Sequence, residues 1–115
     1  MESQTLARKI SQLALDKKGR DILILDLRKL TDITDFFVLM SGESDIHVKA
    51  LTDYIEEKLA EENIKPWHRE GYEVLNWVLL DFVDVVVHIF RPQVREFYSL
   101  EKLWADAPQE RVVEE

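Results

Sequence analysis

Apolar residues in this chain fall into short continuous runs and into longer stretches with helical spacing. Four short runs are rich in β-branched and aromatic residues, and none is long enough for an ordinary helix. They predict strands at residues 21–27, 36–40, 74–80 and 85–90. A further short extended segment, residues 64–69, predicts a fifth strand, and Pro66 places it at a sheet edge or at a strand start.

The longer stretches repeat apolar residues three or four positions apart, which is the spacing of one helix face. They predict helices at residues 2–18, 44–62 and 93–104. Ser44 suits the N-cap of the second helix, and Pro92 suits the first position of the third. Gly19 and Asn63 suit the left-handed position that ends a helix. In the third helix the residues expected to face the core are Val94, Phe97, Leu100, Leu103 and Trp104.

Residues 71–90 contain two of the predicted strands and predict a hairpin. Alternation along the first strand places Trp77, Leu79 and Asp81 on one face. It places the intervening residues on the other: Asn76, Val78 and Leu80. A strand that is apolar on both faces belongs in a sheet covered on both sides, so we expect this hairpin at or near the sheet centre.

These elements together predict an α/β fold, a mixed sheet of about five strands with helices packed on it. A chain of 115 residues has the length of a single domain, which we expect at residues 1–104. Residues 105–115 contain Pro108 and four acidic residues against one arginine, so we expect them to form an acidic flexible tail.

The chain carries 23 acidic and 15 basic residues, for a net charge of −8. Affinity for nucleic acid comes mainly from Lys and Arg, so we expect no direct nucleic-acid binding and favour a basic protein partner. Solubility alone would explain the same charge. The absence of cysteine excludes disulfides and thiolate metal sites and fits a cytoplasmic location. The longest apolar runs fall far short of the roughly 20 residues of a membrane span, so we expect no membrane partner.

The ionisable residues lack the spacing of a catalytic or metal site. Asp81 and Asp84 flank the predicted strand connection, where carboxylates commonly form turns. The histidines lie in three different predicted elements, without the short spacing of a zinc site: His47, His68 and His88. A third group is irregularly spaced and has no nearby histidine: Asp26, Asp32 and Asp35.

Residues 41–45 form a predicted strand-to-helix turn, and anions can bind at the N-terminus of a helix. This turn lacks the glycine spacing and the lysine of a phosphate-binding loop, and Glu43 and Asp45 would repel phosphate. No serine lies in a G-x-S-x-G motif. We therefore expect no enzyme activity, no metal and no cofactor.

Large amphipathic side chains, of the kind that anchor protein interfaces, leave binding as the favoured function. We expect Trp67 and Trp104 to pack in the core or at a sheet edge. Trp77 shares a face with Asp81, and an aromatic anchor beside a carboxylate suits a basic protein surface. The alternative for Trp77 is a buried position under a helix.

Motifs spread over residues 5–104 resemble the ribosomal silencing factor family, also called RsfS or Iojap. The first is the LDL of residues 21–27, and residues of the second helix such as His47 and Leu51 also match. The remaining matches are TDFFVLMSG at 34–42, EGY at 70–72, NWVLLDF at 76–82, DVVVHIF at 84–90 and REFYSLEKLW at 95–104. Their combination and order are specific, whereas each motif alone would be weak.

The resemblance implies a nucleotidyltransferase-like fold without catalytic residues. It implies a translation repressor that binds the large ribosomal subunit through ribosomal protein L-fourteen and blocks joining of the small subunit when nutrients are short. Organellar relatives act in large-subunit assembly. The partner-binding residues that it implies are Glu70, Tyr72, Trp77, Leu79, Asp81 and Asp84.

Three other possibilities stay open from the sequence. The chain could keep a residual nucleotide-binding activity of the nucleotidyltransferase type. It could act as a large-subunit assembly factor. Its partner-binding face could also close a homodimer when no ribosome is present.

One residue departs from the family pattern. The family usually has glycine between the two hairpin strands, where this chain has Val83. A β-branched residue is costly at positive φ, so we expect either another turn type or a strained backbone here.

Overall fold

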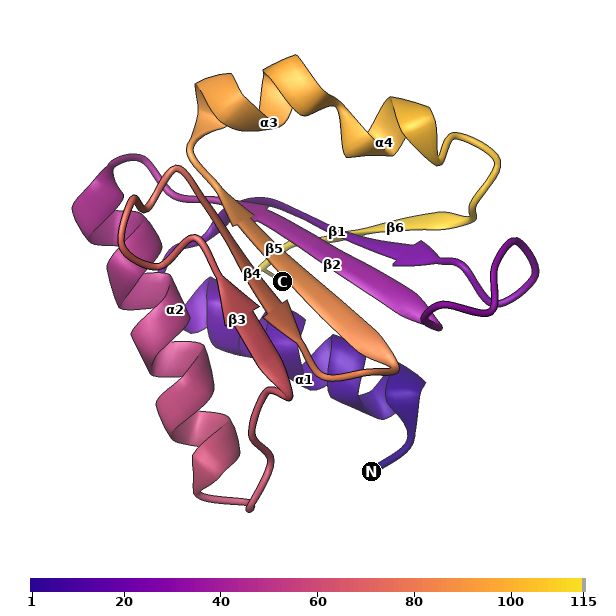
Figure 1. Ribbon diagram of the computed structural model, residues 1–115, viewed down its shortest axis with the longest axis horizontal. Coiled ribbons are helices and arrows are strands. Elements are labelled where there is room, and N and C mark those ends of the chain that lie inside the picture. Colours follow the sequence, from indigo (N-terminus) through magenta and orange to yellow (C-terminus); the bar gives the residue numbers. More distant parts are fainter. Residues whose placement is uncertain (115) are drawn as a thin grey trace.

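A computed structural model describes residues 1–114 and shows a mixed α/β fold (Figure 1). In these residues the helices are α1 (Ser3–Asp16), α2 (Asp45–Ala60), α3 (Pro92–Tyr98) and α4 (Leu100–Leu103). The strands are β1 (Arg20–Asp26), β2 (Phe36–Ser41), β3 (His68–Glu70), β4 (Trp77–Asp81), β5 (Val85–Phe90) and β6 (Gln109–Val112). The predicted strands and the first two predicted helices are confirmed, although β4 begins at Trp77 rather than Val74. The third predicted helix is divided into α3 and α4, and β6 is additional.

The six strands form one sheet in the order β3-β4-β5-β2-β1-β6. β2 and β5 are parallel, and the other neighbouring pairs are antiparallel. β5 lies between β4 and β2, and all six of its residues are buried. The predicted hairpin of β4 and β5 is therefore confirmed, with β5 in the interior of the sheet.

Helices α1 and α2 cover one face of the sheet and make the larger core (Figure 1). The predicted stripe of α2 is fully buried there: Val48, Leu51, Ile55 and Leu59. Val78 and Leu80 of β4 point into the same core. Burial of each such side chain stabilises the fold by roughly 1.5–3 kcal/mol.

The opposite face of the sheet has a smaller core beneath α3 and α4. Leu25, Leu39 and Phe90 are fully buried in it, and Trp77 and Trp104 are partly buried around them. The two faces of β4 therefore differ as predicted, because Val78 and Leu80 are buried while Trp77, Leu79 and Asp81 are partly exposed.

The capping predictions hold for α2 and need correction for α1. Ser44 accepts the His47 backbone N–H at 3.1 Å, and Asn63 ends the helix with φ +61°. After α1 the left-handed residue is Lys18, with φ +60°, and Gly19 follows it. Gly19 instead donates its N–H to the Ala14 carbonyl at 2.8 Å, and a Cβ there would lie 3.1 Å from that oxygen. Close approach, rather than a positive φ, explains this glycine.

The C-terminal segment is not wholly a flexible tail as predicted, because β6 pairs with β1 in antiparallel register. Arg8 holds Glu110 through two hydrogen bonds of 2.9 Å, and Val112 packs against the larger core. The composition of this segment is misleading, since the open edge of β1 supplies the backbone partners that a tail would lack.

The third predicted helix is broken at Ser99, whose φ of +46° separates α3 from α4. Val94, Leu100 and Trp104 pack on the smaller core as expected. The predicted inward orientation of Phe97 and Leu103 is wrong, since they are 80% and 73% exposed. Phe97 lies before the break, in a helix whose buried residue is Arg95, and Leu103 lies after the break in α4. Trp67 lies at the sheet edge, where its backbone N–H donates to the Asp81 carbonyl at 2.8 Å, but its side chain is exposed rather than packed as predicted, with 77% exposure.

Val83 occupies a strained turn between β4 and β5. Its φ is +75°, and the Asp84 N–H bonds to the Phe82 carbonyl at 3.0 Å, as in a γ-turn with positive φ. The chain thus keeps the connection and accepts the strain expected of a β-branched residue.

Replacing Val83 with glycine is expected to stabilise the protein by about 1 kcal/mol. Relief of left-handed strain gains roughly 1–2 kcal/mol, and the greater freedom of unfolded glycine costs roughly 0.5–1 kcal/mol. Urea unfolding of the wild type and of Val83→Gly measures the difference. A destabilised variant would show that this turn is not strained.

Candidate docking surface

Four side chains gather on the part of the sheet that neither α1 nor α2 covers, and we call them the β4 face: Glu70, Trp77, Leu79 and Asp81. Glu70 lies directly opposite Leu79 in the β3–β4 ladder, so both side chains leave the same side of the sheet. Trp77, Leu79 and Asp81 follow one another along that side of β4 and are partly exposed. The face thus has an apolar centre bordered by two carboxylates, and His68, which lies opposite Asp81, approaches Glu70 to 3.3 Å.

Trp77 is held in place from three sides. Its indole N–H donates to Nδ1 of His88 at 3.1 Å. Its ring centroid lies 4.9 Å from that of Phe90 and 4.8 Å from that of Tyr98. Trp77 therefore combines the two roles considered from sequence, since part of the ring joins the smaller core and part stays exposed.

His88 supplies the rigid support behind Trp77. Burial lowers the pKa of its imidazole from 6.5 to about 3, so the ring is neutral at physiological pH. With Nδ1 accepting the indole proton, the neutral ring carries its own proton on Nε2. That atom is buried and has no hydrogen-bond partner among the described residues, while the Phe37 ring meets the imidazole edge-on at 4.5 Å. Packed aromatic rings thus support the β4 face from below, and they are in place before any partner binds.

His88 is a site residue that the sequence pattern did not reveal. The available signal was a lone polar residue inside the otherwise apolar run of β5. Its pairing with Trp77 depends on the β4–β5 register, in which His88 lies opposite Leu79.

The buried His88 should make stability depend on pH. Below pH 6.5 the unfolded chain binds a proton at this histidine, whereas the folded chain does so only near pH 3. Stability therefore falls as pH decreases through this window, by up to about 1.4 kcal/mol per pH unit from this group. Urea unfolding at several pH values should give a shallower slope for His88→Leu than for the wild type. Parallel curves would contradict the assignment.

Asp81 has a structural task besides its place on the face. Its Oδ1 accepts the Val83 N–H at 2.7 Å and so supports the strained turn. Asp84 lies exposed in the same connection, and its carbonyl accepts the backbone N–H groups of Asp35 and Phe36. Both carboxylates are thus near one end of β4, where they add negative charge to the margin of the face.

Tyr72, predicted to join the partner-binding residues, lies elsewhere. Its hydroxyl donates to Asp53 of α2 at 2.6 Å, and the Arg69 guanidinium stacks over its ring at 4.0 Å. These contacts tie the segment after β3 to α2. The structure therefore brings Tyr72 to the helix-covered side and not to Trp77.

No cluster of three metal-ligating side chains occurs in residues 1–114. The N-terminus of α2 is capped by Ser44, and His47 Nδ1 accepts the Glu43 N–H at 2.9 Å. The backbone N–H groups at the N-terminus of α2 are thus partly occupied by the chain's own side chains. In the described part of the chain, no helix is long and apolar enough to cross a membrane.

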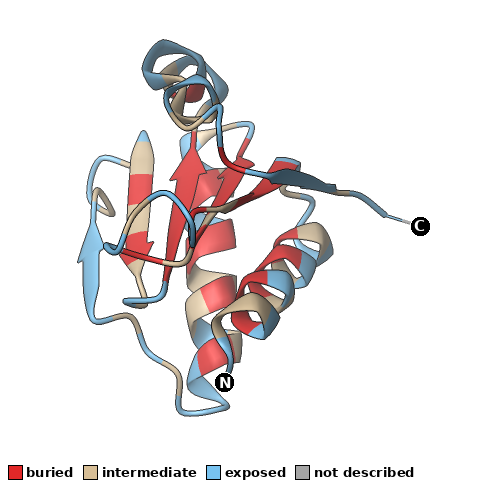
Figure 2. Ribbon diagram, turned by 90° about the vertical axis from the view of Figure 1, so that its right-hand side faces the viewer, coloured by how far each residue is buried: buried red, intermediate tan, exposed pale blue. Residues whose placement is uncertain are grey.

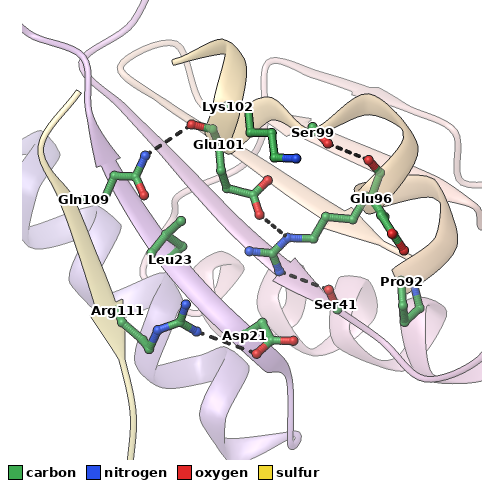
Figure 3. A pocket seen from close by; sticks show the side chains of 11 residues that line it. Asp21, Leu23, Ser41, Pro92, Glu96, Ser99, Glu101, Lys102, Gln109 and Arg111 are labelled. Carbon is green, nitrogen blue, oxygen red and sulfur yellow. Dashed lines mark hydrogen bonds and ion pairs between the residues drawn. The ribbon is translucent and has the colours of Figure 1, made fainter. Parts of the chain in front are cut away.

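A hollow of about 420 Å³ lies between β1, β6 and the α3–α4 segment (Figure 3). Its charged groups largely neutralise one another. Arg95 bonds to Ser41 at 3.0 Å and to Glu101 at 3.1 Å, and Arg111 lies 3.6 Å from Asp21. The hollow therefore presents mixed, mostly paired charge rather than a site for one kind of ion.

Known proteins are similar to this chain in sequence and in fold. The family model described as "Ribosomal silencing factor during starvation" matches residues 1–115. The chain belongs to the ribosomal silencing factor family. The Bacillus subtilis ribosomal silencing factor RsfS is 42% identical over 93 residues, which are 81% of this chain and 79% of that protein.

The chain is also similar to a solved structure and to a protein whose name refers to mitochondria. A crystal structure from Chromobacterium violaceum superposes with a TM-score of 0.88 at 37% identity, covering 99% of this chain and 95% of the other. The mouse protein named "Mitochondrial assembly of ribosomal large subunit protein 1" is 33% identical over 80% of this chain and 42% of its own length. The resemblance identified from motifs is therefore confirmed for family and fold.

Proposed function

We propose that this ribosomal silencing factor is a non-catalytic repressor of translation in the cytoplasm. It binds the large ribosomal subunit through ribosomal protein L-fourteen and prevents the small subunit from joining. The observation that carries the proposal is the β4 face, an apolar centre built on a rigid aromatic base and bordered by carboxylates. Membership of the ribosomal silencing factor family supports it.

The physical character of the β4 face fits a basic protein surface. Trp77 and Leu79 supply apolar contact area, and fixing Trp77 before binding lowers the entropy lost on association. Glu70, Asp81 and Asp84 stand at the margin, where charges mainly steer association and select the partner. The net charge of −8 acts in the same direction and opposes direct contact with ribosomal RNA.

Among the residues predicted to bind the partner, Tyr72 takes a different role in this proposal. Its bond to Asp53 positions the chain that leads from β3 to β4. Glu70, Trp77, Leu79, Asp81 and Asp84 remain the proposed contact residues.

Cosedimentation with isolated large subunits tests the proposal, with a parallel pull-down by purified ribosomal protein L-fourteen. Saturable binding in both assays, weakened by raised salt, is the expected result. Binding to isolated small subunits serves as the control and should be absent. Failure of the wild-type protein to bind large subunits would contradict the proposal.

Action in large-subunit assembly is a second candidate function. It is favoured by the likeness to the mouse protein whose name refers to assembly of the mitochondrial large subunit. The two functions are separable, because an assembly factor would alter the yield of mature large subunits in cells, whereas a silencing factor would act on finished subunits.

A further inference from the structure

Helix α3 has an inverted orientation, because it buries a charged residue and exposes its aromatic residues. The charged Arg95 is its buried residue, only 8% exposed, while the aromatic Phe97 is 80% exposed and Tyr98 51% exposed. Figure 2 shows the α3–α4 segment, at the top, as mostly exposed. Arginine is rarely buried in proteins unless it is paired, and exposed aromatic side chains that gather at one place often mark interaction sites. The orientation of α3 therefore calls for an explanation beyond packing.

The inverted orientation is fixed by specific contacts. Pro92 begins the helix, and Ser99 ends it with a left-handed backbone. Between them the Arg95 guanidinium donates to the Ser41 hydroxyl of β2 and to the Glu101 carboxylate of α4. With Arg95 held inward at two points, Phe97 has to point outward. Its exposure is thus built into the fold.

The exposed aromatic residues of α3 continue the β4 face. The Tyr98 ring packs on Trp77 with 4.8 Å between centroids, and Phe97 meets Tyr98 edge-on at 5.0 Å. Phe97, Tyr98 and Trp77 thus form an unbroken aromatic row from α3 to β4. Glu96, the residue before Phe97 in α3, is exposed and adds a negative charge to this helix.

Interface size argues for this continuation. A specific protein complex buries about 800 Å² on each partner, contributed by roughly 20–30 residues. The β4 face consists of four side chains, three of them already partly buried. Because the aromatic row is continuous, the partner expected for the β4 face is also the one that fits α3.

We propose that Phe97 and Tyr98 of α3 form the second half of the docking surface and bind the same basic ribosomal protein as the β4 face. The inference rests on the proposed function and assigns a specific role to the inverted helix. A substitution of Phe97 tests the inference more directly than one of Tyr98, because the Tyr98 ring also packs on Trp77.

The test is the binding of Phe97→Ala to purified large ribosomal subunits by cosedimentation. We expect an affinity at least about 10-fold lower than that of the wild type, because exposed aromatic anchors of interfaces commonly contribute this much. Trp67→Ala is the matched control, since Trp67 is similarly exposed and lies in a hollow beside Glu56 and Ala60 of α2. It should bind like the wild type. Urea unfolding of both variants verifies that the fold is unchanged.

Several outcomes would overturn this inference, and they differ from failure of the proposed function. If the wild type binds and Leu79→Arg does not, while Phe97→Ala binds normally, docking involves β4 without α3. If Trp67→Ala loses as much affinity as Phe97→Ala, the effect is not specific to α3. If Phe97→Ala only converts a wild-type dimer to a monomer in light scattering, a second copy occupies this surface. If the wild-type protein does not bind large subunits, both the proposed function and this inference are contradicted.

Discussion

Replacing Leu79 with arginine should reduce binding to the large ribosomal subunit by at least about 30-fold. Leu79 lies at the centre of the β4 face, between Glu70 on β3 and His88 on β5. A cation there would remove apolar contact and repel a basic partner, and the loss of a central interface residue commonly costs about 2 kcal/mol or more. Equilibrium binding of a fluorescently labelled variant to isolated subunits measures the change.

Two further variants separate charge from shape. Leu79→Glu also removes the apolar contact but matches the charge expected to suit the partner, so it should lose less affinity than Leu79→Arg. Trp77→Ala should abolish binding too, although it also removes contacts with Phe90 and Tyr98 in the smaller core. Equal losses for Leu79→Arg and Leu79→Glu would contradict a basic partner. Normal binding by both would exclude the β4 face.

Removing the Arg95 side chain should destabilise the protein by roughly 3 kcal/mol. The side chain of Arg95 is only 9% exposed, and that of its partner Glu101 is 31% exposed. Arg95→Ala would leave this carboxylate and the Ser41 hydroxyl without their donor, and breaking a buried ion pair from one side typically costs several kcal/mol. Urea unfolding monitored by circular dichroism gives the value.

Lys102→Ala provides the matched control for Arg95. Lys102 borders the same hollow, yet it is exposed, so its removal should change stability by less than about 0.5 kcal/mol (Figure 3). The double variant Arg95→Met with Glu101→Gln should recover part of the loss, because it removes the stranded charge. A single Arg95→Ala variant as stable as the wild type would show that α3 is not held by this pair.

Much of the fold follows from local pattern. The four strand runs and the stripe of α2 are predictable because residues that share a face repeat at intervals set by strand or helix geometry. The two faces of β4 follow from the same alternation, which places Trp77, Leu79 and Asp81 together. Ser44 and Pro92 mark helix starts through chemistry confined to a few residues.

The features that local pattern misses depend on contacts distant in sequence. β6 forms because it meets the edge of β1, more than 80 residues earlier in the chain. Arg95 points toward the sheet because its guanidinium donates to the hydroxyl of Ser41, 54 residues away, and this fixes the orientation of α3. Tyr72 lies on the helix-covered side of the sheet, where its hydroxyl donates to Asp53, 19 residues away. Helical periodicity predicts that Phe97 faces the core, and such distant contacts override it.

Whether this protein keeps ribosomal subunits apart can be measured in a subunit-joining assay with purified components. Small and large subunits are mixed under conditions that favour joining, with increasing amounts of the protein, and are separated on a sucrose gradient. We expect joined ribosomes to give way to free subunits as the β4 face of the protein occupies large subunits, and Leu79→Arg to leave joining intact. Full joining while the wild-type protein is bound to the large subunit would contradict the proposed repression.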